Sequence, residues 1–220
     1  FEGPVDALLN WRISMRITRR LARSRLTTLT PNHVTVVAIL VGLTAGALAA
    51  RGGWAGVAVA GVLLQLNSIL DSCDGELARL RFQFSKLGQW LDNLADDVVD
   101  NVFIAACGWG LGGSWLWVGL GAAAGRVLVA VATYVMVYRR TGTGDVFAHR
   151  WWFETQKASA DAVYDPRSPV TWLRSLGRRD TFVFVWMLAC VAGLPHWVVA
   201  HGAVIAAVNV AILILHHTVF

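Results

Sequence analysis

Six long apolar stretches dominate this chain, and each approaches the roughly 20 residues that a helix needs to cross the hydrocarbon core of a bilayer. They are Val34–Ala50, Trp54–Leu70, Trp90–Gly110, Trp115–Val137, Phe182–Leu194 and His196–Leu215. With 56% hydrophobic and 15% charged residues, the chain is too apolar for an ordinary soluble domain. Short glycine-containing connections at 51–53 and 110–114 favour antiparallel neighbours. We therefore predict an all-α, polytopic membrane protein in which residues 34–220 form one domain of six transmembrane helices.

The basic residues alternate between the connections of these helices. They gather before the first span, between the second and third, and between the fourth and fifth (12–25, 79–86 and 139–179), whereas the opposite connections hold only Arg51. This alternation follows the positive-inside rule, and it predicts that both termini lie in the cytoplasm of a prokaryotic cell. Topology and contact with lipid headgroups account for the net charge of +5, so we do not expect nucleic-acid binding.

Residues 1–33 are predicted to form a juxtamembrane segment. Arginines alternate there with apolar residues at helical spacing, which is typical of an amphipathic helix lying on an anionic membrane surface. These apolar residues are Leu8, Leu9, Ile13, Ile17 and Leu21. The chain begins with Phe1 rather than Met, so we expect that an upstream domain is missing. The three cysteines lie in or beside apolar helices and are expected to be free thiols.

Carboxylates are concentrated in one short part of the chain. Asp71 and Asp74 are three residues apart, and Asp92 and Asp96 are four apart, so each pair lies on one face of its helix. Because the two helices are neighbours and antiparallel, all four carboxylates can converge. Such mutually repelling anions need compensation, and an all-oxygen ligand set suits Mg²⁺, Mn²⁺ or Ca²⁺, whereas the lack of nearby His disfavours zinc. Four carboxylates can hold two divalent ions, and two-metal sites commonly clamp a phosphate group.

Small residues and one arginine lie between these acids. Gly75, Ala78 and Gly88 remove side-chain bulk, which would let a nucleotide approach the backbone but equally suits close helix packing. Arg79 carries a planar guanidinium that matches phosphate oxygens. The residues by themselves indicate phosphate chemistry with a divalent metal at a membrane site that faces the cytoplasm.

Together, these residues resemble the complete signature of the CDP-alcohol phosphotransferase family. In this chain it reads Asp71-x2-Asp74-Gly75-x2-Ala78-Arg79-x8-Gly88-x3-Asp92-x3-Asp96. The segment TPNHVT (30–35) also resembles the start of that family's first helix. The resemblance implies transfer of a substituted phosphate from a CDP-alcohol to an acceptor hydroxyl, with release of CMP. It further implies that the first three aspartates bind Mg²⁺ or Mn²⁺, that Asp96 is a ligand or the general base, and that the Gly, Ala and Arg residues bind the nucleotide.

The substrates are less constrained than the reaction. The leading segment and the sequence GRRD (177–180) resemble the branch in which this domain follows a nucleotidyltransferase domain, as in di-myo-inositol-phosphate-phosphate synthases. That branch implies CDP-inositol as donor and inositol phosphate as acceptor. The alternative is a phospholipid synthase that uses CDP-diacylglycerol, which a groove open to lipid would favour over a closed polar cavity. A divalent-cation transporter also stays open, although carriers usually place such acids near the bilayer midplane in interrupted helices.

Three arginines outside the signature are candidates for binding an anionic acceptor. Arg126 lies inside a span, where it either pairs with Asp100 or meets an acceptor phosphate. Arg178 and Arg179 precede the fifth span, where they either anchor the cytoplasmic side or form an acceptor site. Asp97 points to another helix face than its acidic neighbours, and we interpret it as a surface or helix-terminus charge.

Two features bear on assembly. Pairs of small residues at 42/46 and 52/56 favour close association of helices. The connection 139–180 is long and basic but not of low complexity, so we expect short interfacial helices in it. The family resemblance also implies a homodimer.

Overall fold

The computed structural model describes residues 4–23, 30–83, 86–141 and 177–219, and these residues form helices and turns without a strand. The predicted all-α class is therefore confirmed for the described part of the chain. In chain order the elements are η1 (a short π-helix, Asp6–Asn10), α1 (Trp11–Arg23), α2 (Pro31–Arg51), α3 (Trp54–Arg81), α4 (Lys86–Leu111), α5 (Gly113–Thr141), α8 (Arg179–Val191) and α9 (Pro195–Val219).

Four of these helices are long and apolar enough to cross a membrane. They comprise Pro31–Arg51, Trp54–Arg81, Gly113–Arg139 and Pro195–His216. Helix α4 has 26 residues but carries the acidic cluster in its first half. Helix α8 has 13 residues, which at about 1.5 Å per residue is shorter than the roughly 30 Å of the hydrocarbon core. The structure thus supports a helical membrane protein with four candidate spans, and the predicted count of six is not confirmed.

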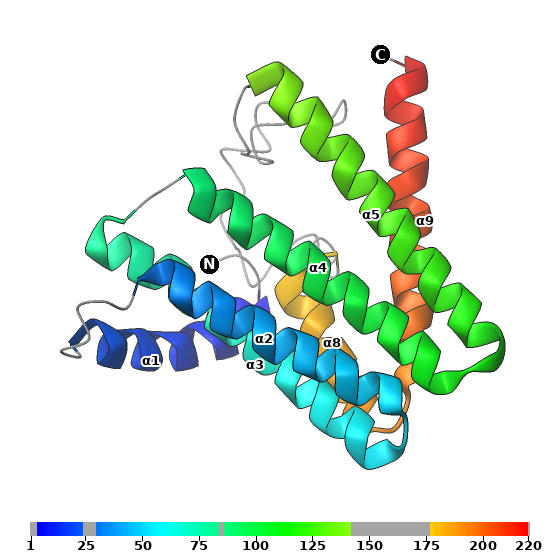
Figure 1. Ribbon diagram of the computed structural model, residues 1–220, viewed down its shortest axis with the longest axis horizontal. Coiled ribbons are helices and arrows are strands. Elements are labelled where there is room, and N and C mark those ends of the chain that lie inside the picture. Colours follow the sequence, from blue (N-terminus) through cyan, green and yellow to red (C-terminus); the bar gives the residue numbers. More distant parts are fainter. Residues whose placement is uncertain (1–3, 24–29, 84–85, 142–176, 220) are drawn as a thin grey trace.

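The described helices pack around a main apolar core, with α2 antiparallel to α3 but parallel to α4, and with α5 parallel to α9. Helix α2 contacts α3 and α4, α3 contacts α8, and α5 contacts α4 and α9. Figure 1 shows α2, α3 and α4 running side by side, with α5 and α9 on the opposite side of the molecule from α1. At the centre, Trp186 is fully buried, lies near Phe103 with ring centroids 6.4 Å apart, and donates its indole N–H to His201 Nδ1. Cys73, Cys107 and Cys190 are buried and free, as predicted.

Glycines allow the closest helix approaches. A Cβ atom at Gly42 would lie 2.5 Å from a methyl group of Val99, so α2 and α4 meet there without room for a side chain. The predicted small pair at 42/46 therefore marks a helix contact. The prediction for 52/56 is wrong, because Gly52 is not helical: it ends α2 with φ +70°, a conformation that favours glycine, and turns the chain toward α3.

Helix α1 is docked on α3 through a polar face. Asn10, Ser14 and Thr18 recur every four residues and are buried against the body of the protein. Ile17 and Leu21 belong to the predicted membrane-facing stripe, yet they pack against a small protein core. The prediction of an amphipathic helix is correct in type, but part of its apolar face serves tertiary packing.

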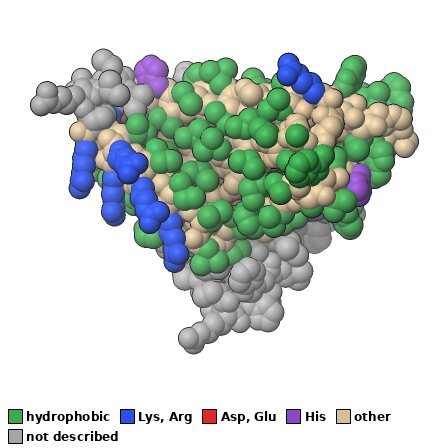
Figure 2. Space-filling model, turned by 90° about the horizontal axis from the view of Figure 1, so that it is seen from below, with side chains coloured by type: hydrophobic (Ala, Val, Ile, Leu, Met, Phe, Trp, Pro, Cys, Tyr) green, Lys and Arg blue, Asp and Glu red, His purple; other side chains and the backbone are tan. Residues whose placement is uncertain are grey.

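The arginines of α1 point away from the protein body. Five of them are exposed, namely Arg12, Arg16, Arg19, Arg20 and Arg23. Figure 2 shows one face of the molecule that is mainly hydrophobic, with Lys and Arg side chains gathered toward one end of it. A largely apolar surface bordered by basic side chains suits a protein embedded in a membrane.

Candidate functional site

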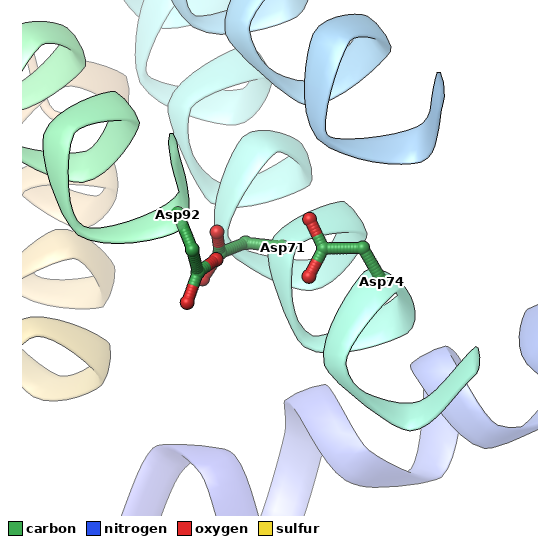
Figure 3. A group of neighbouring side chains, drawn as sticks. All are labelled: Asp71, Asp74 and Asp92. Atoms are coloured by element: carbon green, nitrogen blue, oxygen red, sulfur yellow. The ribbon is translucent and has the colours of Figure 1, made fainter. Parts of the chain in front are cut away.

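Three predicted metal ligands converge between α3 and α4. Asp71 and Asp74 lie on one face near the end of α3, and Asp92 comes from the first half of α4. One carboxylate oxygen from each lies within 4.8 Å of the others, an arrangement that could hold a metal ion (Figure 3). The helical spacing brings the first pair together, and the packing of both α3 and α4 on α2 brings Asp92 to them. Three hard oxygen donors at this separation fit Mg²⁺ or Mn²⁺.

The start of α2 supports this triad from a third side. The hydroxyl of Thr35 donates to Asp74 Oδ2 and also lies 3.3 Å from the carbonyl oxygen of Pro31. The first turn is ordered by the backbone N–H of Thr30, which donates to Nδ1 of His33 at 3.1 Å. The segment TPNHVT therefore places a hydroxyl that orients a candidate metal ligand. Sequence reasoning missed the contact, because residues 35 and 74 are brought together only by the packing of α2 on α3.

Arg179 lies among the carboxylates at the start of α8. Its Nη1 is 2.7 Å from Asp96 Oδ1 and 3.4 Å from Asp71 Oδ2, and its Nε is 3.4 Å from Asp100 Oδ1. Its Nη2 donates to Asn67 Oδ1 at 2.9 Å. The Arg179 side chain is 19% exposed. One guanidinium therefore links α8 to α3 and α4 and offsets the repulsion among several acids.

Arg179 lines a cavity of about 650 Å³ together with Asp71, Asp74, Asp92 and Asp96. Its described lining residues are Asp6, Asn10, Trp11, Met15, Ser68, Asp71, Ser72, Asp74, Gly75, Glu76, Arg79, Leu80, Asp92, Asp96, Arg179 and Asp180. Trp11, Met15 and Leu80 contribute its apolar side chains, and the remainder of this lining is polar or glycine. The sequence predicted the part of the wall that belongs to the signature. It did not predict the part from η1 and α1, which reach the cavity only because α1 docks on α3.

The other signature residues are distributed unevenly around this cavity. Gly75 and Arg79 line it, and a Cβ atom at Gly75 would lie 3.6 Å from the guanidinium of Arg79. Ala78 and Gly88 are half-buried and are not among the described lining residues. Asp96 lies next to the triad and is not itself one of the three grouped ligands.

Arg126, Arg178 and Asp97 are not among the described residues that line the cavity. Arg126 pairs with Asp100, with Nη2 3.6 Å from Oδ2, and is not among the described lining residues of the cavity, so the interpretation as an internal ion pair is supported. Arg178 is exposed beside Asp180, at 3.9 Å. Asp97 is half-buried and accepts a hydrogen bond from Tyr134 at 2.8 Å, so its interpretation as a surface charge is wrong. Most of the connection 139–180 lies outside the described residues.

Comparison with known sequences agrees with this geometry. Residues 28–215 match the family described as CDP-alcohol phosphatidyltransferase. The chain belongs to this family. It is accordingly a transferase of phosphate-containing groups, and its family is membrane-integral and generally uses a divalent metal.

Curated relatives of this CDP-alcohol phosphatidyltransferase domain carry the name bifunctional IPC transferase and DIPP synthase. The protein of Aquifex aeolicus is 28% identical over 94% of this chain and 42% of its own length. That of Thermococcus kodakarensis is 35% identical over 85% of this chain and 37% of its own length. That of Rubrobacter xylanophilus is 40% identical over 63% of this chain and 29% of its own length. The chain thus spans less than half the length of these relatives.

Proposed function

We propose that this protein transfers a substituted phosphate from a CDP-alcohol to an acceptor hydroxyl and releases CMP. The observation that carries the proposal is the carboxylate triad at a polar cavity that also holds two arginines, Arg79 and Arg179. Carboxylates bind divalent metals, and arginines bind phosphate oxygens. The cavity therefore offers both kinds of group that bind a pyrophosphate, a metal site and guanidinium groups.

Asp71, Asp74 and Asp92 would hold the metal, and Asp96 is close enough to the same cavity to complete a site for two Mg²⁺ or Mn²⁺ ions. Divalent ions held there would act as Lewis acids that neutralise negative charge on the pyrophosphate and on the CMP leaving group. The hydroxyl of Thr35 orients Asp74. Gly75 leaves space beside Arg79, and with Ala78 and Gly88 these residues form the proposed nucleotide-binding set.

Asp96 is the proposed general base. A base must lie within hydrogen-bond reach of the proton that it removes, and Asp96 borders the cavity in which an acceptor hydroxyl would lie. Its contact with Arg179 holds the carboxylate in place beside the cavity. Arg179 is also the best placed of the three acceptor candidates. A phosphorylated acceptor could share this guanidinium, which would bring its hydroxyl close to Asp96.

For the substrates, we propose CDP-inositol as donor and inositol phosphate as acceptor. The polar lining of the cavity suits two hydrophilic substrates, and the curated relatives are named IPC transferase and DIPP synthase. CDP-diacylglycerol is the competing donor, because a site within a membrane protein can also admit lipid. Transport is not favoured, because α3 runs without interruption through the acidic residues.

Three larger-scale features belong to the same proposal. The chain would cross the membrane six times, with the cavity and both termini in the cytoplasm, if α4 and the short α8 also cross it. It would act as a homodimer. A nucleotidyltransferase domain would accompany it in the full-length protein, which agrees with relatives that are longer and are named bifunctional.

The test is CMP release by purified protein with Mn²⁺ and inositol phosphate, given CDP-inositol or CDP-diacylglycerol. Release from CDP-inositol alone supports the polyol assignment, and release from the lipid donor alone refutes it. In the same assay, Asp96→Asn should lose at least about a hundredfold in turnover, as general-base catalysis typically contributes that much, while still binding CMP. Asp97→Asn is the matched control, because this adjacent acid bonds Tyr134 instead. Wild-type turnover by Asp96→Asn would remove Asp96 from the mechanism.

A further inference from the structure

Glu76 is a buried acid in the cavity that the proposed chemistry does not use. It lies on α3, is 7% exposed and lines the cavity. Its Oε1 accepts a hydrogen bond of 2.7 Å from the hydroxyl of Ser14 on α1. Its Oε2 is buried and has no hydrogen-bond partner among the described residues. One half of the carboxylate is therefore held in place by the protein, and the other half is unsatisfied.

An unpaired buried carboxylate oxygen is costly, so a hydrogen-bond donor on a ligand would bind there favourably. That part of the ligand cannot be phosphate, because a carboxylate repels it. Arg79, one helical turn further along α3, lines the same cavity and supplies the positive charge that phosphate needs. The group that meets Glu76 is therefore an uncharged N–H or O–H donor attached to a phosphate-bearing ligand.

The surroundings of Glu76 favour a flat, partly apolar group. Trp11 and Met15 flank Ser14 on the α1 side, and Leu80 lies one turn beyond Glu76 on α3. These three residues contribute the apolar side chains of the described cavity lining. A nucleobase needs apolar contacts for its faces and polar contacts for its edge, whereas a polyol has hydroxyls on all sides. The combination of apolar side chains and one carboxylate oxygen matches the base of the donor nucleotide.

We propose that Glu76 selects cytosine by accepting a hydrogen bond from its exocyclic 4-amino group through Oε2. Ser14 is the positioning residue that holds the carboxylate from α1. Uracil carries a carbonyl oxygen in place of that amine, and two acceptors facing each other repel. Glu76 thus discriminates between the bases by pairing with one and repelling the other. The inference rests on the proposed function, because it assigns a base-recognition residue to the nucleotide site of that reaction.

The test measures binding of CMP, UMP and 2′-deoxy-CMP by calorimetry, in detergent with Mn²⁺. Wild type should bind CMP and 2′-deoxy-CMP well and UMP poorly. Glu76→Gln should weaken CMP about tenfold or more, because a bond to a charged group becomes a neutral one. UMP should not weaken, since the amide can donate to its carbonyl, so the preference for CMP over UMP should collapse. Asp97→Asn, which also removes a half-buried acid, should retain that preference.

Other outcomes overturn the assignment. An unchanged CMP-to-UMP ratio in Glu76→Gln, with or without an equal loss for both, would refute base recognition. If Glu76→Gln changed only the ratio of the affinities for CMP and 2′-deoxy-CMP, Glu76 would contact the ribose rather than the base. If Glu76→Gln does not fold, Ser14→Ala is the second test: it should lower the CMP-to-UMP ratio, and an unchanged ratio in a folded Ser14→Ala would refute the proposal. If wild type bound none of the three nucleotides, the proposed function would fail and this inference with it.

Discussion

Replacing Arg179 by Gln removes the cation that links α8 to the acids of α3 and α4. Breaking a fully buried ion pair costs about 3–5 kcal/mol. The cost here is smaller, because Asp71 and Asp96 are 22% and 28% exposed and solvent screens their charge. Asp100 is only 3% exposed, but it keeps Arg126 at 3.6 Å as a second partner. We therefore expect Arg179→Gln to lower the free energy of unfolding by about 2–3 kcal/mol in the absence of divalent ions.

The assay is thermal unfolding of the purified protein in detergent, with EDTA or with Mn²⁺. For a chain of this size, about 1 kcal/mol shifts Tm by roughly 2–4 °C, so the expected loss in EDTA is about 4–12 °C. Mn²⁺ should restore most of it, because the metal supplies positive charge between the same carboxylates. Arg178→Gln is the matched control: its side chain is 46% exposed, and its Tm should stay near that of wild type. A Tm for Arg179→Gln within about 1 °C of wild type in EDTA would refute the electrostatic role that we assign to it.

Two further predictions follow from single contacts. Thr35→Val removes the hydroxyl that orients Asp74 while keeping the side-chain shape, so Mn²⁺ affinity should fall about 10–100-fold; an unchanged affinity by calorimetry would show that the contact does not support the metal site. Gly110→Ala would place a Cβ atom in steric conflict with the backbone oxygen of Ala49, so we expect about 1–3 kcal/mol of destabilisation in a thermal unfolding assay. Gly121→Ala, with nothing within 4 Å, is its control and should be neutral or stabilising; equal effects of the two changes would contradict the packing between α2 and α4.

Several features of the fold were predictable because they depend on local chemistry. Long apolar stretches favour helices, since a helix satisfies its own backbone hydrogen bonds in lipid. Asp71 and Asp74 share a face because three residues make nearly one helical turn. Gly42 allows α2 to approach Val99 because it has no side chain. Each of these follows from the residue itself or from neighbours a few positions away.

Other features could not be predicted, because they depend on how distant helices pack. Sequence treats Arg178 and Arg179 alike, yet the start of α8 aims one at the carboxylates and leaves the other exposed. The apolar residues of α1 gave the clearer sequence pattern, so its buried polar face was not predicted. Ser14 on that face donates to Glu76, which lies 62 residues further along the chain.

The sequence by itself therefore determined the helical class, the membrane character and the acidic motif, because these are properties of composition and of spacing within single helices. Only the tertiary structure decided which arginine meets the acids, which hydroxyl orients Asp74 and which side chains close the cavity. Those contacts join residues far apart in the chain, and their existence depends on the packing of one helix against another rather than on any local pattern.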